Sequence, residues 1–134
     1  MKLLIEHERA DLSFNEDTNT IELVWKKFQN EEVYKMMFTK GIEHLQELGA
    51  TGWLSDIRKE GVVGPATSTW LQTEIIPKAI AFGLSKIAVV MDKDVFKDFY
   101  VKGIEKTVGT CTMKYFDSTE EANKWLKQDL IQVF

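Results

Sequence analysis

The chain has very little of the residues that mark disulfide-bonded or membrane-spanning proteins. Its 134 residues include a single cysteine, Cys111, which excludes a disulfide within the chain. The longest unbroken apolar run, residues 87–91, is far shorter than the roughly 20 residues that cross a bilayer. The sequence therefore predicts no transmembrane segment, although contact with a membrane surface stays open.

Basic charge is also scarce. The chain has 17 Lys and Arg residues against 21 Asp and Glu residues, which gives a net charge of −4 and no basic footprint for DNA or RNA. We therefore expect no nucleic-acid partner. The first residues, Met1–Glu6, reach an acidic side chain too early for a secretory signal, so a cytoplasmic protein is expected.

The overall composition is that of an ordinary globular protein. Hydrophobic residues make up 44% of the chain and charged residues 28%. A chain of this length fits one domain over residues 1–134, and such a domain buries enough surface to need no covalent staple.

Several segments repeat with the period of a β-strand. Apolar and polar residues alternate over residues 3–7, 12–14 and 21–25. Turn-forming residues at 15–19 separate the last two segments, which predicts an antiparallel hairpin near the N-terminus. Further strands are predicted over residues 51–57, 87–91 and 111–116. The run at 87–91 is apolar without alternation, which is typical of a central parallel strand covered on both faces.

Four other segments have the period of an amphipathic helix. They cover residues 30–48, 66–82, 95–107 and the stretch that follows Ser118. Asn30 and Ser118 are suited to N-capping, and Glu121 completes a capping box with Ser118. Pro77 removes a backbone hydrogen bond from the second helix and is expected to disturb it. The pattern predicts an α/β fold in which a mixed β-sheet carries about four helices.

Four segments resemble, in their order, the SpoIIAA-like (STAS/SEC14-domain) proteins of bacteria. They read WLSDIR at 53–58, TWLQTEIIPKAIAFG at 69–83, KIAVVM at 86–91 and YFDSTEEANKWL at 115–126. The resemblance covers nearly the whole chain and implies a small, non-enzymatic domain with a SpoIIAA-like fold. No cofactor motif is present in the sequence, so no cofactor is expected. In that family, the anti-sigma-factor antagonists use protein contacts and a phosphorylatable serine, whereas SEC14-like relatives enclose an apolar ligand.

The chain departs from the antagonist pattern at the start of the second helix. That branch has an Asp-Ser-Ser-Gly or similar turn there, whereas this chain has hydroxyls at Thr67 and Ser68 without the motif. N-capping of the helix is the simpler role for these hydroxyls. Phosphorylation of Ser68 or Thr67 stays open, because a helix N-terminus tolerates a phosphate.

Three acidic residues, Asp56, Asp92 and Asp117, end the three inner strands. The carboxyl ends of parallel strands meet at one edge of a sheet, so these acids are expected to cluster there with Arg58 nearby. A divalent cation is one interpretation. Helix capping and an ion pair between Asp56 and Arg58 account for the same residues, so we expect no metal site.

The helices over 66–82 and 95–107 carry more large apolar side chains than a simple core demands. We therefore expect a non-catalytic module that binds an apolar or amphiphilic, lipid-like small ligand beneath them, with the glycine-rich loop at 61–65 and the helix after it acting as a lid. The alternative is a regulatory or protein-interaction module using the same surface, and a homodimer stays open. The predicted surface comprises Asp56, Arg58, Ser68, Trp70, Leu71, Phe82, Phe96, Phe99 and Tyr100.

Overall fold

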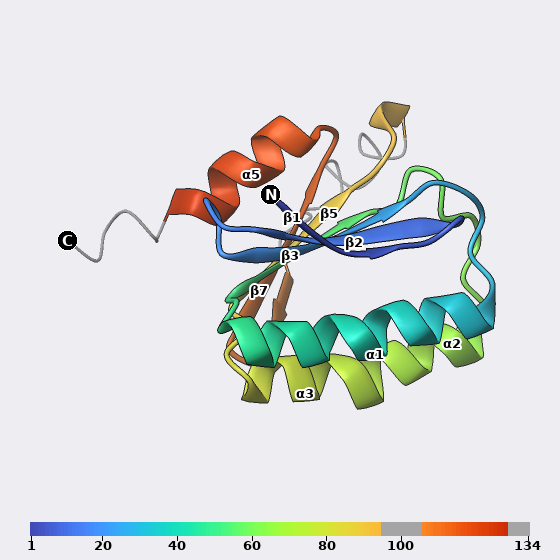
Figure 1. Cartoon of the computed structure of the whole chain (residues 1–134), viewed down its shortest axis with the longest axis horizontal. Helices are drawn as coiled ribbons and strands as arrows, with labels where there is room; N and C mark the ends of the chain where they lie inside the picture. Colours follow the sequence, from blue (N-terminus) through green and yellow to red (C-terminus); the bar gives the residue numbers. More distant parts are fainter. Residues whose placement is uncertain (95–105, 129–134) are drawn as a thin grey trace.

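A seven-stranded mixed sheet forms the centre of the molecule (Figure 1). The computed structural model describes residues 1–94 and 106–128. The strands lie in the order β1-β2-β3-β4-β5-β7-β6, and their bounds are β1 (Lys2–Glu6), β2 (Ala10–Asn15), β3 (Thr20–Trp25), β4 (Gly52–Asp56), β5 (Lys86–Val90), β6 (Lys106–Val108) and β7 (Cys111–Phe116). Strands β3, β4, β5 and β7 are parallel, whereas β2 is antiparallel to its two neighbours, β1 and β3. The predicted α/β class with a mixed sheet is confirmed.

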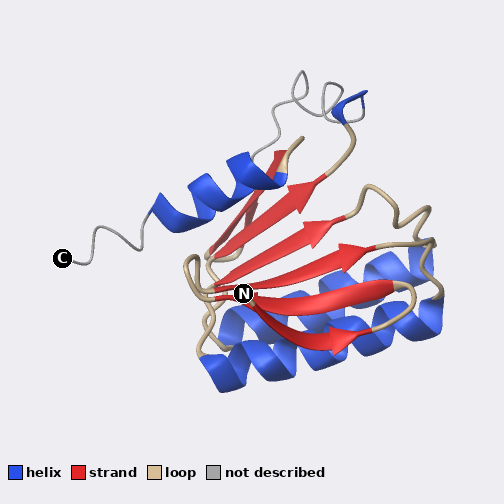
Figure 2. Cartoon of the chain, turned by 45° about the horizontal axis from the view of Figure 1, so that its top comes forward, coloured by secondary structure: helices blue, strands red, loops and turns tan. Residues whose placement is uncertain are grey.

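Helices cover both faces of this sheet (Figures 1 and 2). One face carries α1 (Glu31–Leu48) and a second helical segment made of α2 (Pro65–Trp70), the π-helix η1 (Leu71–Ile75) and α3 (Ile76–Ala81). The opposite face carries α5 (Thr119–Lys127). The sheet thus has a two-helix layer on one side and a single helix on the other.

Strand β5 lies inside the sheet, parallel to both β4 and β7, as the unbroken apolar run at 87–91 predicted. Ile87 belongs to the core beneath α1, whereas Ala88 and Val90 pack in the core beneath α5. Both faces of the strand are therefore buried, and this explains why its sequence does not alternate.

The predicted hairpin is formed by β2 and β3, and β1 adds a third antiparallel strand outside it. Asn19 in the connecting turn has a φ of 53°, a left-handed conformation that asparagine tolerates better than most residues. Its side-chain amide donates a hydrogen bond to the Gly49 carbonyl, which ties the hairpin turn to the end of α1.

Side-chain caps set the starts of two helices. The Asn30 side chain accepts a hydrogen bond from the Val33 N–H at 2.8 Å, and Ser118 Oγ accepts one from the Glu121 N–H at 3.2 Å. Both capped starts agree with the sequence prediction. Gly49, with a φ of 65°, ends α1 in the left-handed conformation that favours glycine.

The disturbance predicted from Pro77 takes the form of a π-helix. The Ile76 N–H donates to the Leu71 carbonyl, five residues back, in the turn just before the proline. Ile75 and Ala79, at and beyond this wide turn, are both buried, as their spacing predicted. Phe82, expected on the ligand or partner surface, is the C-terminal cap of α3 and is 38% exposed.

The structure describes only the last residues of the helix predicted over about 95–107. Residues 95–105, with Phe96, Phe99 and Tyr100, lie outside the described residues. Residues 106 and 107 belong to strand β6, so the prediction is wrong there. Strand β6 pairs antiparallel with β7 across a turn at Gly109, whose φ is 61°, and this short hairpin replaces the end of the expected helix.

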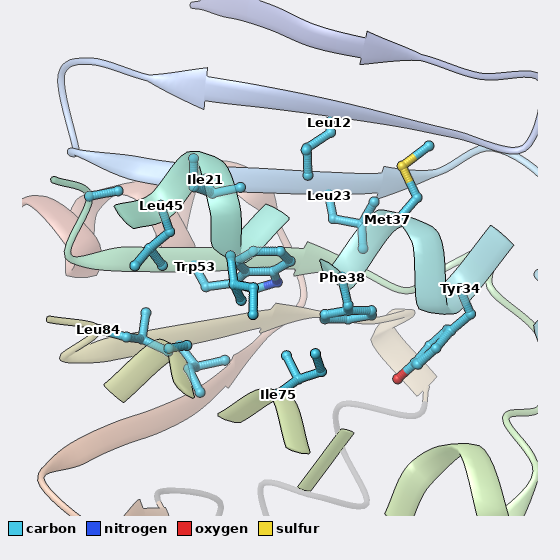
Figure 3. Close-up of a cluster of buried hydrophobic side chains, with 14 of the residues drawn as sticks. Leu12, Ile21, Leu23, Tyr34, Met37, Phe38, Leu45, Trp53, Ile75 and Leu84 are labelled. Atoms are coloured by element: carbon cyan, nitrogen blue, oxygen red, sulfur yellow. The ribbon is translucent and has the colours of Figure 1, made fainter. Parts of the chain in front are cut away.

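Gly41 allows α1 to approach the sheet closely. A Cβ atom at this position would overlap the Trp53 ring, with Trp53 Cζ3 only 2.7 Å away. Figure 3 shows Trp53 beneath α1, next to Phe38, with which it stacks at a ring-centroid distance of 5.2 Å. The helix therefore rests on an aromatic pair that leaves no room for a methyl group.

We expect Gly41→Ala to lower the free energy of unfolding by roughly 1–3 kcal/mol, because overpacking costs more than the gain in helix propensity. Urea denaturation measures this change. Thr39→Ala, on the exposed face of the same helix, is the matched control and is expected to change stability by less than about 0.5 kcal/mol. A Gly41→Ala protein as stable as the wild type would contradict the close packing.

Candidate functional site

A pocket of about 370 Å³ lies between the two-helix layer and the sheet. It falls within the size range of small-molecule sites, about 300–1,000 Å³. Helix α1 lines it with Tyr34, Phe38 and Ile42, which recur every fourth residue and therefore share one face of the helix. Figure 3 shows Tyr34, Phe38 and Trp53 on one side and Ile75 on the other.

The remaining walls follow from the same periodicities. The segment α2-η1-α3 contributes Ser68, Leu71, Ile75, Ile76 and Ala79, and the strands contribute Trp53, Ser55, Ile87, Val89, Met113 and Tyr115. Alternate residues of each strand point to the same face, so all three strands present apolar side chains to the pocket. The resulting cavity is mainly hydrophobic with a few polar groups.

Glu60 is the most unusual group in the pocket wall. It lies in the loop between β4 and α2 and is only 8% exposed. Its backbone is held at both ends, because its N–H donates to the Ile57 carbonyl and its carbonyl accepts from the Gln29 N–H. Burial raises the pKa of the Glu60 carboxyl to about 7. A carboxyl in this state changes charge near neutral pH.

Tyr34 brings a second polar group to the same pocket. Burial raises the pKa of its hydroxyl, and the negative charge of Glu60 raises it further. The hydroxyl is therefore a neutral hydrogen-bond donor at physiological pH. Figure 3 shows it pointing away from α1, toward the side on which Ile75 lies.

Two serine hydroxyls complete the polar groups of the wall. Ser55 Oγ accepts a hydrogen bond from the Trp53 indole N–H at 2.8 Å, which holds the ring in place. Ser68 lies on α2 and accepts a long hydrogen bond from Gln72 at 3.5 Å. Each hydroxyl proton stays available to a second acceptor.

Asp56 and Arg58 belong to a different depression, a cleft of about 520 Å³ at the carboxyl ends of β3 and β4. The Arg58 guanidinium binds the Asp56 carboxylate through two hydrogen bonds, of 2.9 and 2.6 Å. These contacts raise the pKa of the guanidinium. Asp92 lines the same cleft, as does Lys59. The Asp56–Arg58 pair is thus an internally satisfied ion pair at the sheet edge.

The predicted site residues are divided among several places. Ser68 and Leu71 line the apolar pocket, and Asp56 and Arg58 line the separate cleft. Trp70 is half-buried and edge-on to Tyr34, with ring centroids 6.5 Å apart, and Phe82 is exposed at the end of α3. Nothing is described for the three remaining aromatic residues of the prediction, which lie between positions 95 and 105.

Sequence reasoning missed the two most distinctive polar groups, Glu60 and Tyr34. Tyr34 has the inward helical spacing of a core residue, and only its hydroxyl sets it apart. Glu60 stands in a loop sequence, Lys59-Glu60-Gly61, that reads as exposed. Its backbone is bonded to Gln29, and it lines the pocket with residues that are distant in sequence, so no local signal reports its burial.

The described residues contain neither a cluster suited to a metal ion nor a helix suited to span a membrane. No group of three or more His, Cys, Asp or Glu residues in this part of the chain could hold a metal ion. Among the helices described, none is both long enough and apolar enough to cross a bilayer.

Comparison with known proteins agrees with the fold. The family model described as SpoIIAA-like matches residues 10–127, from the start of β2 to the end of α5. Neither the search of curated proteins nor the search of solved structures returned a match. Because the family model matches most of the chain, the chain belongs to the SpoIIAA-like family.

Proposed function

We propose that this protein is a non-catalytic module that binds an apolar or amphiphilic small molecule in the pocket between α1, α2-η1-α3 and the sheet. The observation that carries the proposal is the pocket itself, about 370 Å³ in volume and walled mainly by apolar and aromatic side chains. Small-molecule sites typically combine such walls with a few polar groups. Glu60 and Tyr34 are groups of this kind.

Membership of the SpoIIAA-like family suggests a STAS-type regulatory or protein-interaction module, and that family is generally non-catalytic. The two roles are compatible, because a ligand that stabilises one arrangement of the helices changes the surface they present to a partner. In this proposal, binding of the small molecule changes the helical surface over the pocket, and that surface contacts the partner.

The segment from Glu60 to Ile75 is the proposed lid of the pocket. Its loop contains Gly61, with a φ of 81°, and the N-cap residue of α2 is Gly64, which supplies no side-chain cap. The π-helix η1 then replaces the regular hydrogen bonding before Pro77. Each of these features lowers the free energy needed to open this segment locally.

Hydrogen exchange tests the lid. We expect backbone amides in residues 60–75 to exchange faster than those of β5. Decanol at about ten times its dissociation constant is expected to slow exchange in the lid roughly tenfold, because a bound ligand stabilises the closed form. Strand β5 serves as the internal control. Slow exchange throughout residues 60–75, with no response to decanol, would leave the second function below as the better account.

The second candidate function is the docking of a protein partner at a pair of exposed apolar side chains. Phe28 is 73% exposed and Val62 is 92% exposed. The two residues belong to neighbouring loops, since the Phe28 ring lies against Gly61 and Gln29 donates a hydrogen bond to the Val62 carbonyl. Exposed apolar pairs of this kind are favoured at protein interfaces.

A further inference from the structure

The charge in the pocket wall has one sign. Among the described residues that line the pocket, Glu60 is the only acidic residue, and none is a Lys, Arg or His. Its side chain has no hydrogen-bond partner within residues 1–94 and 106–128, although the residue is more than nine-tenths buried. A buried carboxylate without a partner is costly to keep.

The polar groups of the pocket wall favour one kind of head group on an amphiphilic ligand over the others. An anionic head, such as the carboxylate of a fatty acid, would meet the charge of Glu60 with no cation beside it to compensate. A neutral alcohol would find hydroxyls at Tyr34 and Ser55 but would leave the Glu60 charge unbalanced. A cationic amine donates hydrogen bonds and neutralises that charge at once.

Aromatic side chains favour the same class of ligand. Tyr34, Phe38, Trp53 and Tyr115 all line the pocket. The faces of aromatic rings attract organic ammonium groups, and binding sites for such groups commonly combine rings with a carboxylate. The walls therefore suit both the hydrocarbon body and the charged head of an amine.

We propose that the small molecule bound in the pocket is an organic amine, with an apolar body beneath the lid and a protonated amino group paired with the Glu60 carboxylate. This inference rests on the proposed function, and it names the class of ligand. It predicts that fatty acids are poor ligands in spite of their apolar chains.

The state of Glu60 sets the conditions for a test. The other titratable groups that line the pocket are Tyr115 from β7 and Tyr34 from α1, and burial raises the pKa of Tyr34. With the pKa of Glu60 at about 7, the carboxyl is ionised at about pH 8.5, where a primary amine is still protonated. At about pH 5.5 the carboxyl is mainly neutral, and the attraction for the amine is lost.

Calorimetric titration with decylamine, decanol and decanoate compares three head groups on one chain length. At about pH 8.5, decylamine is expected to bind roughly tenfold or more tightly than either of the others, and this preference is expected to shrink at about pH 5.5. Glu60→Gln, which keeps the shape of the side chain and removes its charge, is expected to abolish the preference by weakening decylamine binding roughly tenfold.

Glu74→Gln is the matched control, because Glu74 lies on the exposed side of η1 and the exchange is chemically identical. It is expected to keep the preference for decylamine. Equal affinities for the three compounds, or a preference that survives Glu60→Gln, would overturn the inference and leave the proposed function standing. Failure of all three compounds to bind the folded wild-type chain would overturn both.

Discussion

The free energy of unfolding is expected to fall as the pH rises from about 4.5 to about 7, and Glu60→Gln is expected to remove much of that fall. Burial raises the pKa of the Glu60 carboxyl from 4.5 to about 7, so the folded protein holds this proton more tightly than the unfolded chain does. The stabilisation is complete below about pH 4.5 and is lost as the pH passes through 7. A shift of this size corresponds to roughly 3 kcal/mol.

Urea denaturation of both proteins at several pH values measures this effect. Burial also raises the pKa of Glu22, which accepts a hydrogen bond from Asn15, but Glu22 is present in both proteins. The difference between wild type and Glu60→Gln therefore isolates Glu60. At about pH 8 the variant is expected to be the more stable of the two, because it buries no charge. A difference that does not vary with pH would show that the carboxyl is solvated.

Filling the pocket is expected to have the largest effect on ligand binding. Ser68 lies in the pocket wall on α2, and an indole ring at this position would occupy space that a ligand requires. Ser68→Trp is expected to weaken decanol and decylamine binding by at least roughly tenfold, a loss of about 1.4 kcal/mol or more. Fluorescence-independent titration calorimetry is the suitable measurement, because the chain already has four tryptophans.

Thr69→Trp is the matched control for this substitution. Thr69 is the next residue of the same helix and is exposed, so an indole there adds the same bulk outside the pocket. It is expected to leave binding within about threefold of the wild type, since surface substitutions seldom disturb a distant site. Equal losses in both variants would point to damage to α2 rather than to occupation of the pocket.

The features that could be predicted from the sequence are those with a local signal. The apolar run of β5, the turn at Asn19, and the caps Asn30 and Ser118 each reflect chemistry within a few residues, and all four agree with the structure. A resemblance carried by several ordered segments was enough to identify the family, although no single segment is specific.

The features that could not be predicted depend on contacts between distant residues or on where a helix ends. Phe82, which the sequence placed within the helix over 66–82, lies beyond the end of α3 and is exposed. The hairpin of β6 and β7 is short, and its first residues, 106 and 107, were assigned to the end of the helix over 95–107. Glu60 is buried although its loop sequence is polar, and its carbonyl accepts a hydrogen bond from the distant Gln29 N–H.

Native mass spectrometry of the freshly purified chain, alone and with added decanol or decylamine, tests most directly whether the pocket beneath α1 and α2-η1-α3 holds a small molecule. The expected result is one bound molecule per chain in the wild type and in Thr69→Trp, either retained through purification or acquired on addition, and none in Ser68→Trp. A wild-type spectrum that contains the free chain alone under every condition, or bound mass that Ser68→Trp does not reduce, would contradict the account.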